Sequence, residues 1–397
     1  MVYDFSTNTL ASLLIVATLQ VLIYPLIAKS VSAYNYGLIL TIMGIVNTIV
    51  NSLGNSLNNI RLVRNQTYEN RGIKGDFNVI LLAVSILGAI FTLCLILGFQ
   101  NIGMLNDIIL IFTVILGIVK SYFLVDYRLK LNFTLNLICN GVNAIGYVVG
   151  LFIFRLTNIW TFPFLMGEVF GVLFLLFTTD LIKEPTKTTE ALKETFSSYL
   201  MLILTCAMAT ALSYMDRLII FPLLGGEAVS TFTVATFFGK SIGLVFTPIA
   251  GVLLGYYAQK SFKFTRKLFW HINIIVLLFS AAFFGVSCIV STWFTGILYP
   301  SLIESAKPYI LIANLGAILG MTASMTQPAI LKFAPMVWQI FIQLAYSVIY
   351  ILLGIFMLKV YGISGFCICI IFANIVRLVM LYLVGHIYLS KGEKIYE

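Results

Sequence analysis

Ionisable side chains stand inside otherwise apolar stretches of this chain, at Glu168, Asp216, Arg217, Lys240 and Arg377. A charge at mid-bilayer costs roughly 2.5–3.5 kcal/mol on insertion scales, so such a residue usually faces a wet cavity or a partner. The carboxylates Glu168 and Asp216 are candidates for coupling to H⁺ or Na⁺. Lys240 and Arg377 have no acidic residue within a helical turn, which favours an anion-attracting cavity. The alternative for both cations is pairing with Glu168 or Asp216 on another helix.

Amide side chains form a second pattern. One stretch carries asparagines at spacings of four, four and three, which places them on one helix face: Asn47, Asn51, Asn55 and Asn58. A second stretch repeats the theme with Asn132, Asn136, Asn140 and Asn143. Amides donate and accept hydrogen bonds at once, which suits sugar hydroxyls. Amide side chains can also form hydrogen bonds between helices, but four asparagines in succession on one face favour a helix face that lines a water-filled cavity.

Catalytic patterns do not emerge. The sequence has no Gly-rich phosphate loop, no nucleophile elbow and no paired carboxylates. Its six cysteines lie in apolar runs without metal-ligand spacing, so we expect small buried hydrophobes. We therefore predict a protein that is not an enzyme and that has neither a cofactor nor a metal site.

The elements that position these residues are apolar runs. Hydrophobic residues make up 60% of the 397 residues and charged residues only 10%, whereas soluble domains carry roughly 25% charge. The runs are continuous rather than alternating, which predicts helices and not a barrel. Twelve reach the roughly 20 residues that a span needs: about 6–29, 34–60, 77–99, 103–125, 133–154, 158–181, 197–222, 229–256, 267–290, 303–325, 335–358 and 362–388. The predicted fold is an all-α polytopic membrane protein.

Charge sets the predicted topology. Most Lys and Arg fall in alternate loops, which places both termini in the cytoplasm. The net charge of +9 thus reflects topology and anionic lipid headgroups, and a nucleic-acid partner is not needed. Residues 183–196 are the most charged segment, and we expect a cytoplasmic linker there that becomes helical near Thr188. The linker divides the chain into two six-helix lobes, 1–182 and 197–397, related as parallel repeats.

Two hairpins carry a family pattern. Residues 20–65 contain Tyr36-Gly37, Gly54 and Arg61, and residues 213–238 contain Asp216, Gly225 and Ala235. With the twelve spans and the central linker, these positions resemble the O-antigen and capsule repeat-unit flippases of the multidrug/oligosaccharidyl-lipid/polysaccharide (MOP) exporter superfamily. Phe232 departs from the pattern, because the family usually has Tyr there.

The resemblance implies a MATE-like protein of the bacterial cytoplasmic (inner) membrane. Such a protein moves undecaprenyl-diphosphate-linked oligosaccharide units, for lipopolysaccharide O-antigen or capsule, to the outer leaflet by alternating access. Implied partners are this lipid-linked oligosaccharide, membrane lipids, a polysaccharide polymerase and a chain-length regulator. Arg61, Lys240 and Arg377 would attract the diphosphate, and the sugar would meet the amides Asn47, Asn51, Asn55, Asn136 and Asn140.

Other functions remain open at this point. A cation-coupled multidrug exporter of the same superfamily would rely on Asp216 and Glu168 instead of the cations. A membrane glycan polymerase or glycosyltransferase usually has a large outer loop, whereas no predicted outer loop here exceeds about a dozen residues. A lipid II flippase typically has more than twelve spans.

Overall fold

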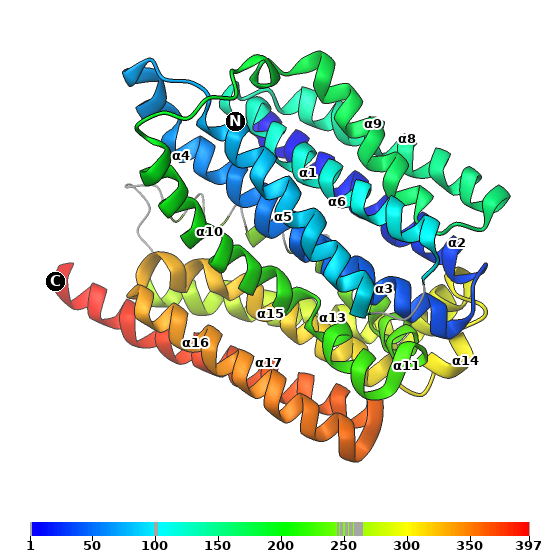
Figure 1. Cartoon of the computed structure of the whole chain (residues 1–397). Coiled ribbons are helices and arrows are strands. Elements are labelled where there is room, and N and C mark those ends of the chain that lie inside the picture. The colour runs from blue at the N-terminus through cyan, green and yellow to red at the C-terminus, as the bar shows by residue number, and fades with distance from the viewer. Residues whose placement is uncertain are drawn as a thin grey trace. The chain divides into compact units, whose positions relative to one another are not determined.

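The computed structural model describes residues 2–98, 102–243, 246, 249, 250, 253, 257 and 265–396. All regular secondary structure in these residues is helical (Figure 1). Ten helices there are long and apolar enough to cross a membrane; Phe162–Thr178 is apolar but shorter, and the stretch Val337–Tyr388 contains two helices that meet at Gly362. The predicted spans thus have helical counterparts, although most of 244–256 lies outside the described residues. The prediction of an all-α polytopic membrane protein is confirmed.

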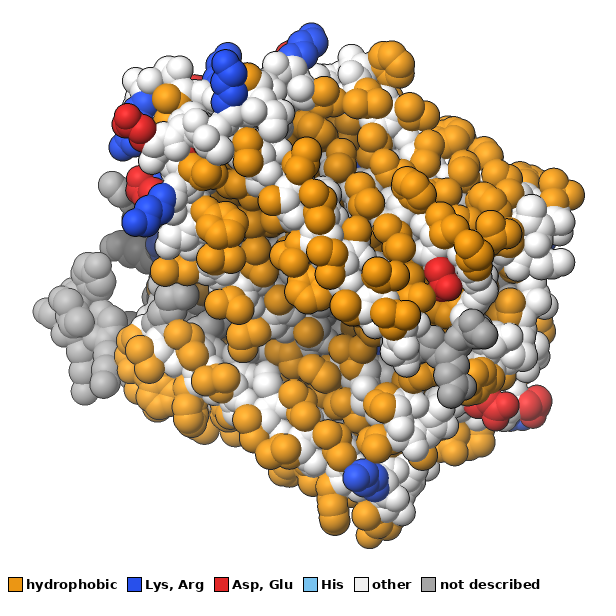
Figure 2. Space-filling model, in the orientation of Figure 1, with side chains coloured by type: hydrophobic (Ala, Val, Ile, Leu, Met, Phe, Trp, Pro, Cys, Tyr) orange, Lys and Arg blue, Asp and Glu red, His pale blue; other side chains and the backbone are white. Residues whose placement is uncertain are grey.

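Large apolar side chains cover much of the outside of this protein. Phe177, Ile289 and Leu97 are at least 80% exposed. Figure 2 shows a face that is mostly hydrophobic, with most of its Lys, Arg, Asp and Glu side chains near the edges. Exposing this much apolar surface to water would be unfavourable. The hydrocarbon core of a bilayer would cover it.

The first compact unit comprises Met1–Ile27 and Thr41–Tyr214. Its long helices run alongside one another (Figure 1). Helices α8 and α9 pack closely because Gly146 and Gly150 let the α9 backbone approach: a Cβ at either glycine would lie 2.5 Å from a carbonyl oxygen of α9. The helices are α1 Val2–Ala17, α2 Tyr24–Ala28, α3 Ala33–Val50, α4 Ser56–Arg71, α5 Asp76–Gly98, α6 Met104–Phe123, α7 Val125–Leu129, α8 Phe133–Thr157, α9 Phe162–Thr178 and α10 Leu192–Ser213. The part of α3 up to Leu40 belongs to the second unit.

The second compact unit comprises Ala28–Leu40 and Met215–Glu397. Gly225 (φ 80°) interrupts α11, and Gly362 (φ 62°) interrupts α17, so each of these elements is two helices joined by a turn. The segment 28–40 belongs here because Gly37 meets Gly226, where a Cβ on Gly37 would lie 1.8 Å from the Gly226 carbonyl oxygen. The helices are α11 Met215–Ser241, α13 Arg266–Leu298, α14 Ile303–Ala306, α15 Ile310–Phe333, α16 Met336–Val348 and α17 Gly354–Tyr396.

The structure corrects some predicted boundaries. Residues 185–189 have no regular structure and α10 begins only at Leu192, so a helix from Thr188 was wrong. Tyr214 separates α10 from α11 inside the predicted span 197–222. The predicted span 303–325 is divided into α14 and the later α15, which continues through Pro328 to Phe333. Because α10 lies in the first unit, its residues 197–213 fall in a different unit from the rest of the predicted lobe 197–397. The relation of the lobes as repeats stays a prediction.

In the described part of the chain, three short π-helical segments interrupt the regular helices: Thr18–Ile23, Asn51–Asn55 and Ile349–Leu353. A π-helical turn bonds i to i+5 and inserts an extra residue into the helix, which rotates everything that follows it. Such segments are frequent at functional sites. The segment Asn51–Asn55 falls within the predicted asparagine face.

Candidate functional site

A small cavity in the first unit is surrounded by α3, α6, α8 and α9. Its lining side chains that carry polar groups are Tyr24, Asn47, Thr113, Tyr147 and Glu168. The Lys120 ammonium lies 2.8 Å from Glu168 Oε1, and the two side chains are 12% and 13% exposed. Glu168 Oε2 has no hydrogen-bond partner among the described residues. One carboxylate oxygen is therefore paired with lysine, while the other is buried beside the cavity without a hydrogen-bond partner among the described residues.

The pairing of Lys120 with Glu168 was missed from the sequence, because 48 residues separate them on α6 and α9. Gly171 makes room for it: a Cβ there would lie 2.8 Å from Lys120 Cδ and 3.0 Å from Asn143 Nδ2. Asn143 is fully buried, and neither of its amide atoms has a hydrogen-bond partner in the described part of the chain. Burying such a group unsatisfied costs about 1–3 kcal/mol, so the position beside Lys120 suits a hydrogen-bonding ligand.

The asparagines of α3 and α4 do not share one wall. Asn47 lines the cavity, and Asn55 donates from Nδ2 to Oδ1 of Asn51 at 2.6 Å. Asn58 is buried and donates to the Ser121 carbonyl oxygen at 2.8 Å. Asn58 therefore lies within packed helices and does not face a hydrated wall. The single hydrated face predicted for these four residues was therefore wrong.

The second asparagine series lies on α8 of the same unit. Asn132 caps this helix by accepting a hydrogen bond from the backbone of Leu135 at 3.1 Å. Asn136 is half-buried and Asn140 is buried. Their exposure therefore falls along the helix toward Asn143, and Asn136 is the more accessible of the two predicted sugar-binding residues.

In the second unit, the predicted carboxylate Asp216 meets the predicted cation Lys240 across the turn at Gly225. Lys240 Nζ lies 2.7 Å from Asp216 Oδ2. The Asp216 side chain is 5% exposed, whereas the Lys240 side chain is 41% exposed. Asp216 Oδ1 also accepts from the backbone N–H of Arg217. The pairing alternative thus holds for Lys240, whose ammonium nonetheless keeps an accessible side.

Arg377 on α17 has no carboxylate partner among the contacts of the described residues. Its Nη2 donates to Gln327 Oε1 of α15 at 2.8 Å. Its guanidinium carbon lies 4.9 Å from the ring centroid of Tyr346 on α16, a cation–π geometry. The side chain is held in place by these neutral groups and is half-buried. Its charge is therefore not neutralised by any of these contacts.

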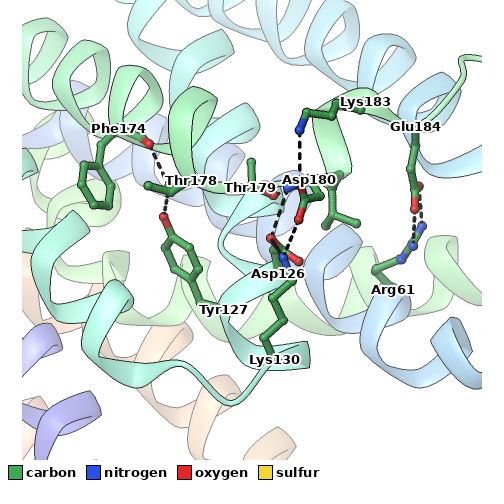
Figure 3. A network of polar contacts seen from close by, with 11 residues as sticks. Arg61, Asp126, Tyr127, Lys130, Phe174, Thr178, Thr179, Asp180, Lys183 and Glu184 are labelled. Carbon is green, nitrogen blue, oxygen red and sulfur yellow. Dashed lines mark hydrogen bonds and ion pairs between the residues drawn. The ribbon is translucent and has the colours of Figure 1, made fainter.

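Arg61 is engaged differently from the other predicted cations. Both of its terminal nitrogens donate to Glu184, at 2.7 and 2.9 Å, and its guanidinium lies 4.6 Å from the ring centroid of Phe77. The Arg61 and Glu184 side chains are 7% and 10% exposed. Figure 3 shows this bidentate pair joining α4 to the segment after α9. A carboxylate already occupies the fork with which Arg61 would bind a phosphate.

More contacts in Figure 3 hold the same segment, residues 178–184, to the first unit. Lys130, just after α7, lies 2.9 Å from both Asp126 and Asp180. Lys183 lies 3.2 Å from Asp180, and Tyr127 hydrogen-bonds Thr178. Lys130 and Lys183 lower the pKa of the Asp180 carboxyl. The predicted linker is thus fastened to the helix ends of this unit.

Metal and redox centres receive no support from the described side chains. No group of three or more His, Cys, Asp or Glu residues comes together in the described part of the chain. The six cysteines are all free. The site chemistry of the described residues consists of ion pairs, amides and cations held by neutral groups, as Arg377 is by Gln327 and Arg128 is by Asn58 and Asn59.

Comparisons with known proteins identify the fold. No family profile and no curated protein sequence matches the chain. Among solved structures, it is similar to an inward-facing multidrug resistance MATE family transporter of the MOP superfamily, with a TM-score of 0.67, 14% identity and coverage of 98% of this chain and 96% of that one. It is equally similar to the lipid II flippase MurJ in an inward closed conformation (TM-score 0.67, 18% identity, 96% and 86% coverage).

An outward-facing MATE transporter of the MOP superfamily also matches, with a TM-score of 0.63, 12% identity and coverage of 98% and 96%. Both an inward-facing and an outward-facing structure therefore cover nearly the whole chain. At these identities the likeness establishes architecture: the chain has the fold of the MATE transporters and of the lipid II flippase, structures that include members of the MOP superfamily.

Proposed function

We propose that this protein is a flippase that moves undecaprenyl-diphosphate-linked oligosaccharide repeat units, for O-antigen or capsule, across the bacterial cytoplasmic membrane by alternating access. The observation that carries the proposal is Arg377, a cation near the middle of a membrane helix with no carboxylate among its contacts. The likeness to a lipid II flippase supports the same class of cargo.

Leaving a charge unneutralised inside a membrane is costly, so its retention suggests an anionic ligand. Arg377 presents a planar fork of donors that matches two phosphate oxygens. Gln327 engages one terminal nitrogen at 2.8 Å, and Tyr346 supports the guanidinium plane. These neutral neighbours orient the side chain without satisfying its charge, as a diphosphate-binding site requires.

Lys240 is the second proposed contact with the diphosphate. Asp216 holds its ammonium at 2.7 Å, but the Lys240 side chain remains 41% exposed. An ammonium has three donors, so one carboxylate does not exhaust it. Asp216 thereby positions Lys240, and pairing lowers the free-energy cost of placing each charge inside the membrane.

The sugar part of the cargo would need hydrogen-bonding surface. Asn55 is exposed, and Asn47, Asn51 and Asn136 are half-buried. Each amide donates and accepts, which matches hydroxyl groups. Asn140 is buried and would contribute only after a rearrangement of α8.

We further propose that the carboxylates supply ion coupling. Glu168 in the first unit keeps one oxygen unpartnered beside a cavity, and Asp216 in the second unit is almost fully buried against Lys240. Binding H⁺ or Na⁺ at either carboxylate would compete with its lysine partner. Coupling would then act by loosening an ion pair that holds two helices.

A cation-coupled multidrug exporter is the second candidate. It is favoured by the likeness to MATE transporters and by the buried carboxylate of Asp216. A cationic drug would use that carboxylate and would be repelled by Arg377. Drug resistance without a change in surface glycan would favour this candidate over the flippase.

The deciding experiment replaces Lys240 and Arg377 by alanine, singly, in the full-length chain. We expect each variant to reach the membrane at normal levels and to lose at least tenfold in glycan export. Lys359→Ala removes an exposed lysine of α17 that lies before the Gly362 turn, and this control variant should export normally. Full export by both Lys240→Ala and Arg377→Ala would refute the cationic site.

A neighbouring-protein test addresses the proposed partners. A flippase of this cargo would operate beside a polysaccharide polymerase and a chain-length regulator. Loss of the flippase should leave lipid-linked repeat units in the inner leaflet, while loss of the polymerase should leave single units exported. A flippase knockout in which lipid-linked repeat units still reach the outer leaflet at the normal level would contradict the proposal.

A further inference from the structure

The flank formed by α5 and α6 of the first unit carries an open groove, separate from the small cavity at Glu168. The groove has a volume of about 580 Å³ and an almost entirely apolar lining. Its lining includes Ser85 and Ala89 from α5 and Ile111, Ile115 and Val119 from α6. The two helices run side by side in Figure 1. We call this feature the α5–α6 groove.

The dimensions of the α5–α6 groove suit a hydrocarbon chain. Along α5 it extends from Asn78 to Leu93, which at 1.5 Å per residue is about 22 Å. Half of the bilayer core is roughly 15 Å deep. An acyl chain that starts at the membrane surface therefore fits inside the groove along its full length within one leaflet.

Small residues make the groove concave. Leu82, Ile86 and Ile90 project from α5 and are more than half exposed. Between these walls, Ser85 is buried and its hydroxyl has no hydrogen-bond partner among the described residues. Ala89, one turn further on, leaves room that a larger side chain would fill.

The groove begins at the charged end of the unit, which the topology prediction places in the cytoplasm. Asn78 lines it there and donates to the Glu184 carbonyl oxygen at 2.8 Å. Just before α5, Gly75 contacts the segment that follows Glu184: a Cβ on Gly75 would lie 2.6 Å from the Lys187 carbonyl oxygen. Lys74 and Lys187 thus flank one backbone contact next to the groove entrance.

Both lysines are exposed and have no ion-pair partner among the described residues. Near Lys187, Glu184 is paired with Arg61, and Glu190 is exposed three residues away. The carboxylate nearest to Lys74 in sequence, Asp76, is fully buried and accepts hydrogen bonds from Tyr68 and from the backbone of Thr189. It is therefore committed to the interior. The start of α5 adds the positive end of a helix dipole, so the entrance is complementary to an anion.

We propose that the α5–α6 groove binds an anionic phospholipid of the inner leaflet, with one acyl chain between α5 and α6 and the phosphate against Lys74 and Lys187. The apolar groove accommodates the acyl chain of the lipid, and the two unpaired lysines select an anionic headgroup. The proposal concerns a lipid that stays bound to the first unit, and it does not depend on the identity of the transported cargo.

Native mass spectrometry of the full-length protein in detergent tests the proposal, with dioleoyl phosphatidylglycerol and dioleoyl phosphatidylcholine as probes. Each basic residue near a membrane surface is worth about 1 kcal/mol toward anionic lipid, so two correspond to about 30-fold in affinity. We expect phosphatidylglycerol to bind more tightly than phosphatidylcholine. The variant Lys74→Gln/Lys187→Gln should remove that preference, reducing phosphatidylglycerol affinity about 30-fold.

Two controls keep the test specific. Lys267→Gln/Lys332→Gln removes two other exposed lysines and should leave binding unchanged. Ala89→Trp fills the groove and should abolish the tight site, and the milder Ala89→Leu should weaken it. Leu204→Trp, at a position 67% exposed on α10, is the matched bulky control.

Three results would overturn the proposal. Equal affinities for the two lipids would remove the headgroup selectivity, and unchanged binding by both Ala89 variants would remove the groove. Tighter, groove-dependent binding of undecaprenyl phosphate than of phosphatidylglycerol would assign the groove to the carrier lipid instead.

Discussion

Arg61 allows a structural role to be separated from a binding role. Its guanidinium makes two hydrogen bonds to Glu184, with both side chains at most 10% exposed. Removing one partner of such a buried pair costs about 3–5 kcal/mol, because the other charge is left uncompensated. We therefore expect Glu184→Ala to lower the free energy of unfolding by that amount, even though Phe77 still faces the guanidinium.

The compensating variant is Arg61→Met/Glu184→Met. Replacing both members of a buried ion pair by apolar residues of similar size is often neutral or stabilising, so we expect this double variant to recover most of the stability lost in Glu184→Ala. Unfolding of the purified protein in detergent measures the free energies. Glycan export measured in the same variants then reports function.

The two roles of Arg61 predict different outcomes. If Arg61 only holds the segment after α9, the double variant regains both stability and export. If Arg61 contacts the cargo, stability returns and export stays absent. A loss below about 1 kcal/mol for Glu184→Ala, in the range of exposed pairs, would refute the assignment of a buried, bidentate ion pair.

Three more predictions follow from single contacts. Gly226→Ala should destabilise the second unit, because its Cβ would lie 2.2 Å from the Tyr34 carbonyl oxygen; Gly98→Ala, with nothing within 4 Å, should be neutral in the same thermal-unfolding measurement. The lowered pKa of Asp180 means that its stabilising contribution is present above the unfolded pKa and lost as pH falls through the folded pKa. The protection factors of residues 179–184, in which the pH dependence of intrinsic amide exchange is divided out, should therefore fall on acidification, and Asp180→Asn should abolish that dependence. Glu168→Gln should reduce ion-driven transport while leaving cargo affinity within twofold; a tenfold loss of affinity would place Glu168 in the cargo site instead.

Helix positions were predictable because each span is a long apolar run, and a bilayer requires such runs whatever their neighbours are. Breaks inside the runs were not predictable from hydropathy. Tyr214 ends α10 within an otherwise continuous stretch, and the structure places the residues on either side of it in different units. Gly225 is a glycine in the left-handed region, and glycine is the one visible cue of a turn at that point.

The site residues show the limit of spacing arguments. Asn58 is buried and bonded to a backbone carbonyl oxygen of α6, which the regular spacing of the asparagines could not reveal. The pairing of Asp216 with Lys240 was one of two alternatives that sequence left open, since 24 residues and a turn separate them. Asn143 stood in the predicted series, but its lack of partners emerged only when Lys120 and Gly171 were placed beside it.

In each unit a polar side-chain contact joins two helices, but the charged group that it leaves without full compensation is an acid in the first unit and a base in the second. In the first unit, Lys120 of α6 neutralises one oxygen of Glu168 of α9 and leaves the other oxygen unpartnered. In the second, Gln327 of α15 holds Arg377 of α17 without neutralising it. The first arrangement suits a proton or a small cation, and the second suits a phosphate. If the units are repeats, as the sequence predicts, equivalent helix contacts carry a carboxylate in the first unit and a guanidinium in the second. The coupling ion and the anionic cargo can then bind at separate groups without competing.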